Sequence, residues 1–263
     1  MNEDLGMAKP LSGWRVLVPR PAGRGTDLAD LLTEQGAEPV AVPLISVVPE
    51  VSAELDLAVR ELAAGAFTWL AVTSAAAVAS LVRRARALGT DCLIPPSTRV
   101  AAVGPGTARS LGQAGVRVDL LPDGPGSAET LLRSWPDPVP GDRVLLPQSR
   151  IARPRLADGL RAKGLDVLTV AAYRTIPCPP GAAITTELAA GGFDVVLLTS
   201  PSTVAALPAV HPGTVIAVIG STTEAAARAA GLVPACVATE PSARGLVDAL
   251  VRHRHRHQGK RKQ

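Results

Sequence analysis

The chain has 263 residues, of which 47% are hydrophobic and 19% charged, and this composition excludes a disordered protein. Domains usually hold about 100 to 150 residues, so the length is enough for two. No apolar run reaches the roughly 18 to 20 residues that a transmembrane helix needs, and the acidic N-terminus MNEDLGMAKP has no secretory leader. We therefore expect a cytoplasmic protein with no membrane partner.

The formal net charge of +4 is concentrated at the C-terminus. Residues 252–263 hold six of the 27 basic residues and no acid, so 21 basic residues remain against 23 acidic ones. Terminal basic runs are usually solvated, and this one predicts a disordered tail over 253–263 and no nucleic-acid partner. The sequence predicts free thiols and no metal site, because Cys92, Cys178 and Cys236 are far apart and lack CxxC spacing.

Short apolar runs alternate along the chain with alanine-rich stretches, which is typical of βαβ units around a parallel sheet. Buried strands are predicted at residues 15–18, 69–72, 99–103, 143–146, 194–198 and 214–219. Further strands are predicted at 39–47, 116–121, 167–172 and 234–238. Helices are predicted to begin near Thr26, Ser74, Gly106, Pro154, Ser202 and Ser221, several of them at hydroxyl residues suited to capping.

Three segments of the first half recur in the same order in the second half. The segments that begin GWRVLVPRP, FTWLAVTSAAAV and TRVAAVGPGTA reappear as GDRVLLPQSR, FDVVLLTSPSTV and TVIAVIGSTTEA. A repeat of this length indicates two sibling domains, with a ligand cleft expected between them. One cut in the Pro-rich stretch 135–141 would separate the copies. Alternatively the copies exchange their first segments, which the long extended runs 37–50 and 165–178 favour.

The turns after the predicted strands carry the chemical signal. They read VTSAAA, VGPGTA, LTSPST and IGSTTE, and are small, hydroxylated and uncharged. Such turns gather at the carboxyl edge of a parallel sheet, where helix N-termini present free N–H groups, and they suit an extended anionic ligand. Ser74, Thr107, Ser200 and Thr223 could instead only cap helices, but their recurrence at four equivalent turns favours a binding surface.

Tyr173 is the only tyrosine of the chain, and the matching position of the first repeat, near Ile45, has no polar side chain. A phenol is protonated at neutral pH, so it can donate a hydrogen bond or a proton but is a poor base. Tyr173 is therefore either a candidate acid or a residue packed at a domain joint. GxGxxG, Walker and GxSxG motifs are missing from the sequence, which disfavours a nucleotide cofactor and a serine hydrolase.

Taken together, an ordered set of motifs resembles the uroporphyrinogen-III synthase family over nearly the whole chain. The set is VLVPRP, LAVTSAAAV, VAAVGPGTA, LLPQSRIARPRL, AAYRT, LLTSPSTV, AVIGSTTEAA and ATEPSARGLVDAL. The resemblance implies a monomer of two three-layer α/β domains that exchange segments and are joined by two extended strands. One domain would comprise residues 11–44 with 174–252, and the other residues 45–173.

The resemblance also implies a reaction, the dehydrative cyclisation of hydroxymethylbilane to uroporphyrinogen III in tetrapyrrole biosynthesis. The terminal pyrrole ring is inverted, by way of an azafulvene cation and a spiro intermediate, without cofactor or metal. Hydroxymethylbilane synthase is the implied transient partner that hands over the substrate.

Site residues follow from the same resemblance. Tyr173 matches the family tyrosine proposed to assist departure of the substrate hydroxyl. Positions that match the hydroxyl-bearing turns, and would hold the acetate and propionate arms, are Ser74, Thr107, Ser200, Thr222 and Thr223. Arg20 and Arg153 fall at matching positions and would either pair with a carboxylate or lie on the surface.

Two other functions stay open at this point. A synthase-like binding or regulatory module for an anionic small molecule would use the same turns without catalysis. An enzyme acting on a phosphorylated sugar is disfavoured, because no clustered carboxylates or metal ligands accompany the turns.

Overall fold

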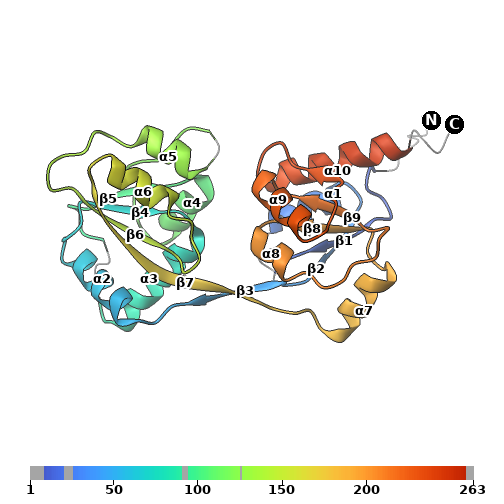
Figure 1. Ribbon diagram of the computed structural model, residues 1–263, viewed down its shortest axis with the longest axis horizontal. Coiled ribbons are helices and arrows are strands. Elements are labelled where there is room, and N and C mark those ends of the chain that lie inside the picture. The colour runs from blue at the N-terminus through green and yellow to red at the C-terminus, as the bar shows by residue number, and fades with distance from the viewer. Residues whose placement is uncertain (1–8, 21–25, 91–93, 125, 259–263) are drawn as a thin grey trace, which may run out of the picture. The chain divides into compact units, whose positions relative to one another are not determined.

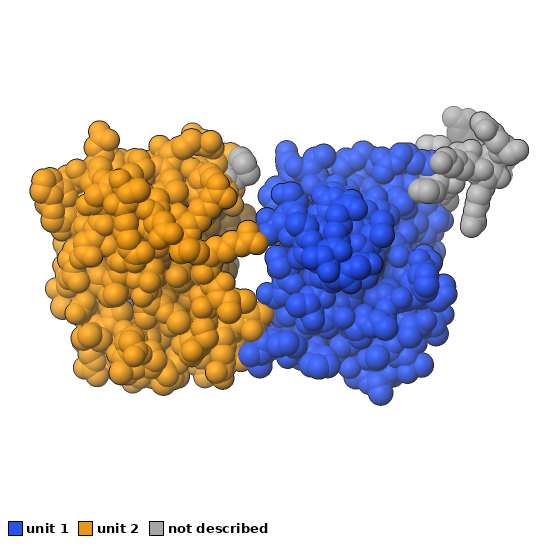
Figure 2. All heavy atoms as spheres, viewed as in Figure 1, with its two compact units in different colours: residues 1–46, 176–263 blue, residues 47–175 orange. Residues whose placement is uncertain are grey.

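The computed structural model describes residues 9–20, 26–90, 94–124 and 126–258 (Figure 1). The chain forms two compact units, coloured separately in Figure 2. Unit 1 comprises Met1–Ser46 and Ile176–Gln263, and unit 2 comprises Val47–Thr175. The Pro-rich stretch 135–141 therefore lies inside unit 2, and the chain passes from one unit to the other twice.

Unit 1 is built on a five-stranded sheet with strand order β10-β9-β8-β1-β2. Its strands are β1 (Arg15–Val18), β2 (Glu38–Ala41), β8 (Val195–Leu198), β9 (Val215–Val218) and β10 (Cys236–Val237), paired in parallel. Helices α1 (Thr26–Glu34) and α10 (Ala243–Gln258) pack on one face. Helices α7 (Ala182–Ala190), α8 (Pro201–Ala205) and α9 (Ser221–Ala229) pack on the other face.

Unit 2 is built on a second five-stranded sheet, with strand order β3-β7-β6-β4-β5. Its strands are β3 (Ile45–Pro49), β4 (Trp69–Val72), β5 (Arg99–Ala102), β6 (Arg143–Ser149) and β7 (Asp166–Pro177). Helices α2 (Ala53–Ala63), α3 (Ala75–Ala87) and α4 (Pro105–Gln113) cover one face, and α5 (Ala128–Ser134) and α6 (Arg155–Ala162) cover the other (Figure 1). Each sheet is thus the middle of three layers.

Alternation along the strands explains why both faces of each sheet are covered. In β4, for example, Leu70 and Val72 belong to the core under α2, α3 and α4, whereas Trp69 and Ala71 belong to the core under α5 and α6. All four side chains are buried, as the unbroken apolar run predicted. The prediction of an α/β fold with parallel sheets is confirmed.

Three predicted segments differ in the structure. The run 39–47 is interrupted, so that its ends join different sheets as β2 and β3. The predicted strand at 116–121 is reduced to one bridge between Ala101 and Leu120, because the Asp119 carboxylate, not a continued ladder, accepts the backbone N–H of Val100. The strand predicted at 167–172 is part of a longer strand, β7, whose bounds are close to those of the extended run predicted at 165–178.

The prediction of a disordered tail from residue 253 is wrong for residues 253–258, which continue α10. The helix is extended because its side chains pack on Trp14: the Arg254 guanidinium lies 4.6 Å from that ring and the His253 ring 6.4 Å from it. Residues 259–263 lie outside the described residues, as does Cys92. Cys178 and Cys236 are free thiols, and burial raises the pKa of Cys236 to about 11. In the part of the chain that is described, no helix has the length and apolar character to cross a membrane.

Candidate functional site

The parallel sheets place the predicted site residues at the carboxyl edge of their strands. In unit 2, Ser74 follows β4, Thr107 lies in the first turn of α4 after β5, and Arg153 follows β6. In unit 1, Arg20 follows β1, Ser200 follows β8, and Thr222 and Thr223 lie in the first turn of α9 after β9. Ligands of open α/β sheets bind at this edge.

The structure brings Ser74 and Tyr173 into direct contact. Ser74 Oγ donates to the Tyr173 hydroxyl oxygen at 3.0 Å and accepts the backbone N–H of Ala77 at 3.1 Å. The phenol oxygen is thus an acceptor, and its own proton has no acceptor among the described residues. The phenol can therefore still donate its hydrogen to a ligand.

A bulge in β7 sets the direction of the Tyr173 side chain. Gln148 of β6 pairs with Ala171, but the next residue, Ser149, pairs with Tyr173, which leaves Ala172 as an extra residue. Neighbouring residues of a regular strand point to opposite faces, whereas Ala172 and Tyr173 both pack against the core under α2, α3 and α4. The bulge therefore turns the phenol to the face on which Ser74 lies.

The two serines of the turns do cap helices, as the alternative interpretation proposed. Ser74 caps α3, and Ser200 caps α8 by accepting the backbone N–H of Thr203 at 3.2 Å. A capping oxygen still carries a hydrogen that it can donate. In Ser200 this hydrogen is available to a ligand, whereas in Ser74 it is donated to Tyr173. Capping is therefore compatible with ligand binding for Ser200 and with the contact to Tyr173 for Ser74.

The threonines of the other two turns do not cap. Gly104 and Gly220 occupy the N-cap positions of α4 and α9, and neither helix has a side-chain cap. Thr107 and Thr223 are buried in the first turns, whereas Thr222 is exposed. The first N–H groups of α4 and α9 consequently stay available for an anionic group.

The two predicted arginines differ in exposure. Arg20 is half-buried and its backbone N–H donates to Val18 O at 2.8 Å, whereas Arg153 is exposed. Within the described residues neither guanidinium forms an ion pair. Both are free to pair with a carboxylate.

The family model described as uroporphyrinogen-III synthase HemD matches residues 7–248 of this chain. The chain belongs to the uroporphyrinogen-III synthase family. It is 32% identical over 173 residues to a uroporphyrinogen-III synthase of Synechococcus elongatus, a match that covers 65% of this chain and 64% of that protein. It is 35% identical over 197 residues to a provisionally named uroporphyrinogen-III synthase of Methanothermobacter thermautotrophicus, covering 71% of this chain and 74% of that protein.

Solved structures show the same fold. A mutant uroporphyrinogen III synthase of Thermus thermophilus superposes with a TM-score of 0.61 at 23% identity, covering 92% of this chain and 99% of that one. A uroporphyrinogen-III synthetase of Helicobacter pylori gives a TM-score of 0.61 at 15% identity, covering 91% of this chain and 98% of that one.

In this member of the uroporphyrinogen-III synthase family, the sequence prediction missed an ion pair beside Tyr173. Arg150 Nε donates to Glu50 Oε1 at 2.8 Å, and Glu50 is buried. The hydrogen bond and charge of Arg150 lower the pKa of the Glu50 carboxyl from its ordinary value. The two residues lie 100 positions apart, so no local pattern could have indicated the pair.

A second missed residue is Ser149, the partner of Tyr173 in the β6–β7 register. Its hydroxyl oxygen is buried and has no hydrogen-bond partner in the described structure. Buried polar atoms almost always have a hydrogen-bond partner. The unpaired Ser149 hydroxyl beside Tyr173 is therefore expected to lower the stability of the folded chain.

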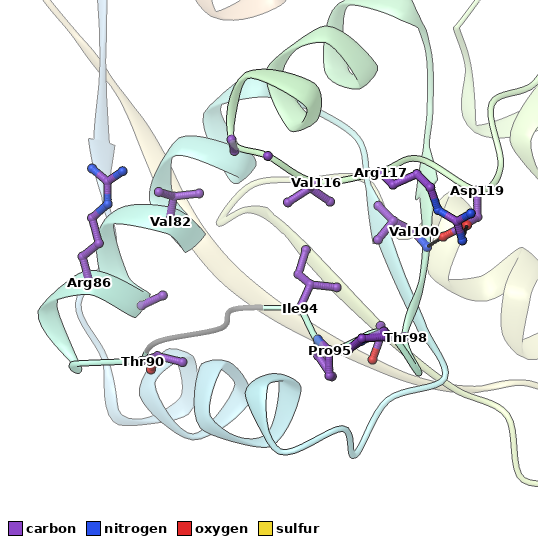
Figure 3. A pocket seen from close by; sticks show the side chains of 14 residues that line it. Val82, Arg86, Thr90, Ile94, Pro95, Thr98, Val100, Val116, Arg117 and Asp119 are labelled. Carbon is purple, nitrogen blue, oxygen red and sulfur yellow. Dashed lines mark hydrogen bonds and ion pairs between the residues drawn. The ribbon is translucent and has the colours of Figure 1, made fainter.

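Unit 2 also contains a pocket of about 570 Å³ (Figure 3). It is lined by the ends of α3 and α4 and the start of β5, and so opens at the amino edge of that strand. Its carboxylate, Asp119, is already occupied by Arg117 and by the N–H of Val100. None of the predicted site residues lines this pocket.

Proposed function

We propose that this chain catalyses the conversion of hydroxymethylbilane to uroporphyrinogen III. Membership of the uroporphyrinogen-III synthase family supports the proposal, and the observation that carries it is the Ser74–Tyr173 hydrogen bond, which leaves the phenol proton free at the carboxyl edge of the sheet. Reactant and product differ by one water. The net change involves no oxidation or reduction, so the reaction requires no redox cofactor.

Tyr173 acts in the first step. Its phenol transfers its proton to the hydroxymethyl oxygen as the C–O bond breaks, so that water leaves and Tyr173 becomes a phenolate. The pyrrole nitrogen lone pair stabilises the resulting azafulvene cation. A positioned acid contributes typically about 10² to 10⁴ in rate.

The later steps depend on holding the linear chain with its ends close together. The substituted α-carbon of the terminal ring attacks the cation to form a spiro intermediate. The bond from that carbon to the neighbouring methylene then breaks, and the free α-carbon of the same ring attacks the new cation, which inverts the ring. Loss of a proton, which balances the proton given up by Tyr173, restores the aromatic pyrrole. Proximity of this kind lowers a barrier by several kcal/mol, about 7 to 11 in the best cases.

The residues predicted to bind the substrate would hold its carboxylates. The donors come from the uncapped starts of α4 and α9, the hydroxyls of Thr107, Ser200, Thr222 and Thr223, and the cations of Arg20 and Arg153. Ser74, whose hydrogen is donated to Tyr173, contributes through that contact. Charge-assisted hydrogen bonds are roughly twice as strong as neutral ones. We propose that the two units are domains with exchanged segments, close to 11–44 with 174–252 and 45–173.

The decisive experiment mixes the purified protein with freshly generated hydroxymethylbilane, oxidises the products and separates uroporphyrin isomers I and III by chromatography. Spontaneous closure yields isomer I, because no ring is inverted. A dominant isomer III, absent with heat-denatured protein, is the expected result. Isomer I formed at the rate of the protein-free reaction would reject synthase activity and favour a binding module for an anionic small molecule.

The instability of the substrate bears on partners and location. A substrate that closes spontaneously is best received directly from the enzyme that makes it, so we propose a transient contact with hydroxymethylbilane synthase. We also propose that the enzyme is a cytoplasmic monomer, which is the simplest arrangement for a direct transfer of the substrate. Adding hydroxymethylbilane synthase in a coupled assay should reduce the fraction of isomer I below that obtained with added substrate.

A further inference from the structure

The ion pair of Glu50 and Arg150 joins the two strands that flank β7. Glu50 follows β3 and Arg150 follows β6, and β7 lies between these strands in the sheet. The side chains meet through the 2.8 Å contact of Arg150 Nε with Glu50 Oε1. Both residues, and all of the contacts that follow, lie within unit 2.

The backbone of the same two residues holds the bulge of β7. Glu50 N donates to Ala172 O at 2.9 Å, and Arg150 N donates to Tyr173 O at 2.9 Å. Ala172 is the extra residue of the bulge, and Tyr173 is the residue at which pairing with β6 resumes. The two carbonyls of the bulge are therefore bound from opposite sides, by residues whose side chains bind each other.

This arrangement bears directly on the phenol. Without the extra residue, Tyr173 would point to the face opposite Ala172, away from Ser74. A bulge interrupts the regular ladder, so it persists only where other contacts hold it. The Glu50 side chain is 8% exposed, so its carboxylate is better shielded from solvent than that of a surface pair, whereas Arg150 is exposed.

We propose that Glu50 and Arg150 are positioning residues that hold the β7 bulge and thereby aim the Tyr173 hydroxyl at its reaction partner. This rests on the proposed function for its catalytic consequence. The structural part of the proposal, that the ion pair sets the position of the Tyr173 side chain, does not depend on any activity.

The catalytic part is tested by a double-mutant cycle of Glu50→Gln with Tyr173→Phe, followed by initial rates of isomer III formation. We expect Glu50→Gln alone to lower kcat on the order of tenfold, as a small misplacement does, with KM changed by less than about twofold. In the Tyr173→Phe background the same substitution should change kcat by less than about twofold, since no hydroxyl remains to be aimed. Equal losses in both backgrounds, or no loss in the native background, would overturn the proposal.

Two further variants exclude general damage. Arg150 is 59% exposed, so Arg150→Gln should fold normally and reproduce the kcat loss, while Arg150→Lys, which keeps the charge, should restore most of the rate. Glu129→Gln breaks a comparable ion pair of the same unit, the 2.7 Å contact with Arg155, and should leave kcat unchanged. Loss of rate in Glu129→Gln, or full activity in Arg150→Gln, would contradict the positioning role.

The structural part has a readout that needs no substrate. Tyr173 is the only tyrosine, so a sample labelled with tyrosine that carries ¹³C only at Cζ gives a single tyrosine signal in NMR spectra. Glu50→Gln should shift that signal, and Glu129→Gln should leave it in place. An unmoved signal in Glu50→Gln would reject the positioning role even if the protein forms isomer III. A shifted signal in a protein that forms only isomer I would reject the proposed function alone.

Discussion

At the scale of single residues, the Tyr173 hydroxyl has two properties that an acid needs. Its oxygen accepts from Ser74 at 3.0 Å, and its proton has no acceptor among the described residues. Tyr173 itself could be singled out because it is the only tyrosine. Its contact with Ser74, 99 positions away, could not, because no local pattern records which turns a fold brings together.

Tyr173→Phe removes the hydroxyl and keeps the ring. We expect kcat for isomer III to fall by about 10² to 10⁴, the usual contribution of a positioned acid. The KM should change little, because the carboxylate contacts of the substrate are made elsewhere. Rates at saturating hydroxymethylbilane, with isomers separated by chromatography, measure this. An unchanged kcat would leave Tyr173 with a packing role only.

Ser149→Ala tests the orphan hydroxyl in β6. An unpaired buried polar group costs about 1 to 3 kcal/mol, so its removal should raise the free energy of unfolding by about 1 kcal/mol. Urea denaturation followed by circular dichroism measures the change. Ser97→Ala, at an exposed position, is the matched control and should be neutral. A marked loss of stability in Ser149→Ala would show that the hydroxyl has a partner, such as a bound water.

At the scale of elements, helix caps determine which N–H groups of a turn are available, and the bulge determines the direction of the Tyr173 side chain in β7. The hydroxyl residues of the turns were correctly associated with helix starts, but only Ser74 and Ser200 cap, while glycines leave α4 and α9 without side-chain caps. The apolar run of β7 predicted a strand without indicating a bulge. A bulge depends on the register with a neighbouring strand, which the run itself does not contain.

The Glu50–Arg150 pair, which links the strands beside β7, makes stability depend on pH. The pKa of Glu50 is lowered from its ordinary 4.5, so the unfolded chain takes up this proton at a higher pH than the folded chain. The stabilising contribution is therefore complete above that ordinary value and is lost as the pH falls toward the lowered pKa. The stability difference between the native protein and Glu50→Gln should shrink over the range from about one pH unit above that ordinary value down to the lowered pKa. A constant difference in urea denaturation across that range would contradict this coupling.

At the scale of the whole molecule, each unit has its own two cores, one on each face of its sheet. No buried cluster of the described residues contains side chains of both units. The repeat predicted two sibling bodies from the sequence alone. The order of the repeats in the chain was compatible with either of two divisions into domains. In the structure, residues 1–46 and 176–263 form one unit.

Because each unit has its own cores, we expect a core substitution to destabilise only the unit that contains it. Leu70→Ala in unit 2 and Leu197→Ala in unit 1 each empty a fully buried site, which costs about 2 to 5 kcal/mol. Native-state hydrogen exchange followed by mass spectrometry should show lost protection confined to the unit that carries the substitution. Equal loss in both units would show that the two bodies unfold as one.

The sequence by itself determined the parallel α/β class, the duplication, the helix starts after the strands and the candidate role of Tyr173. These features depend on periodicity, turn chemistry and residue type, which are local properties of the chain. Only the tertiary structure decided which segments share a sheet, where β7 bulges, and that Glu50 and Arg150 meet beside Tyr173. Those features depend on contacts between residues about a hundred positions apart, and such contacts are made by packing and strand register rather than by neighbouring residues in the chain.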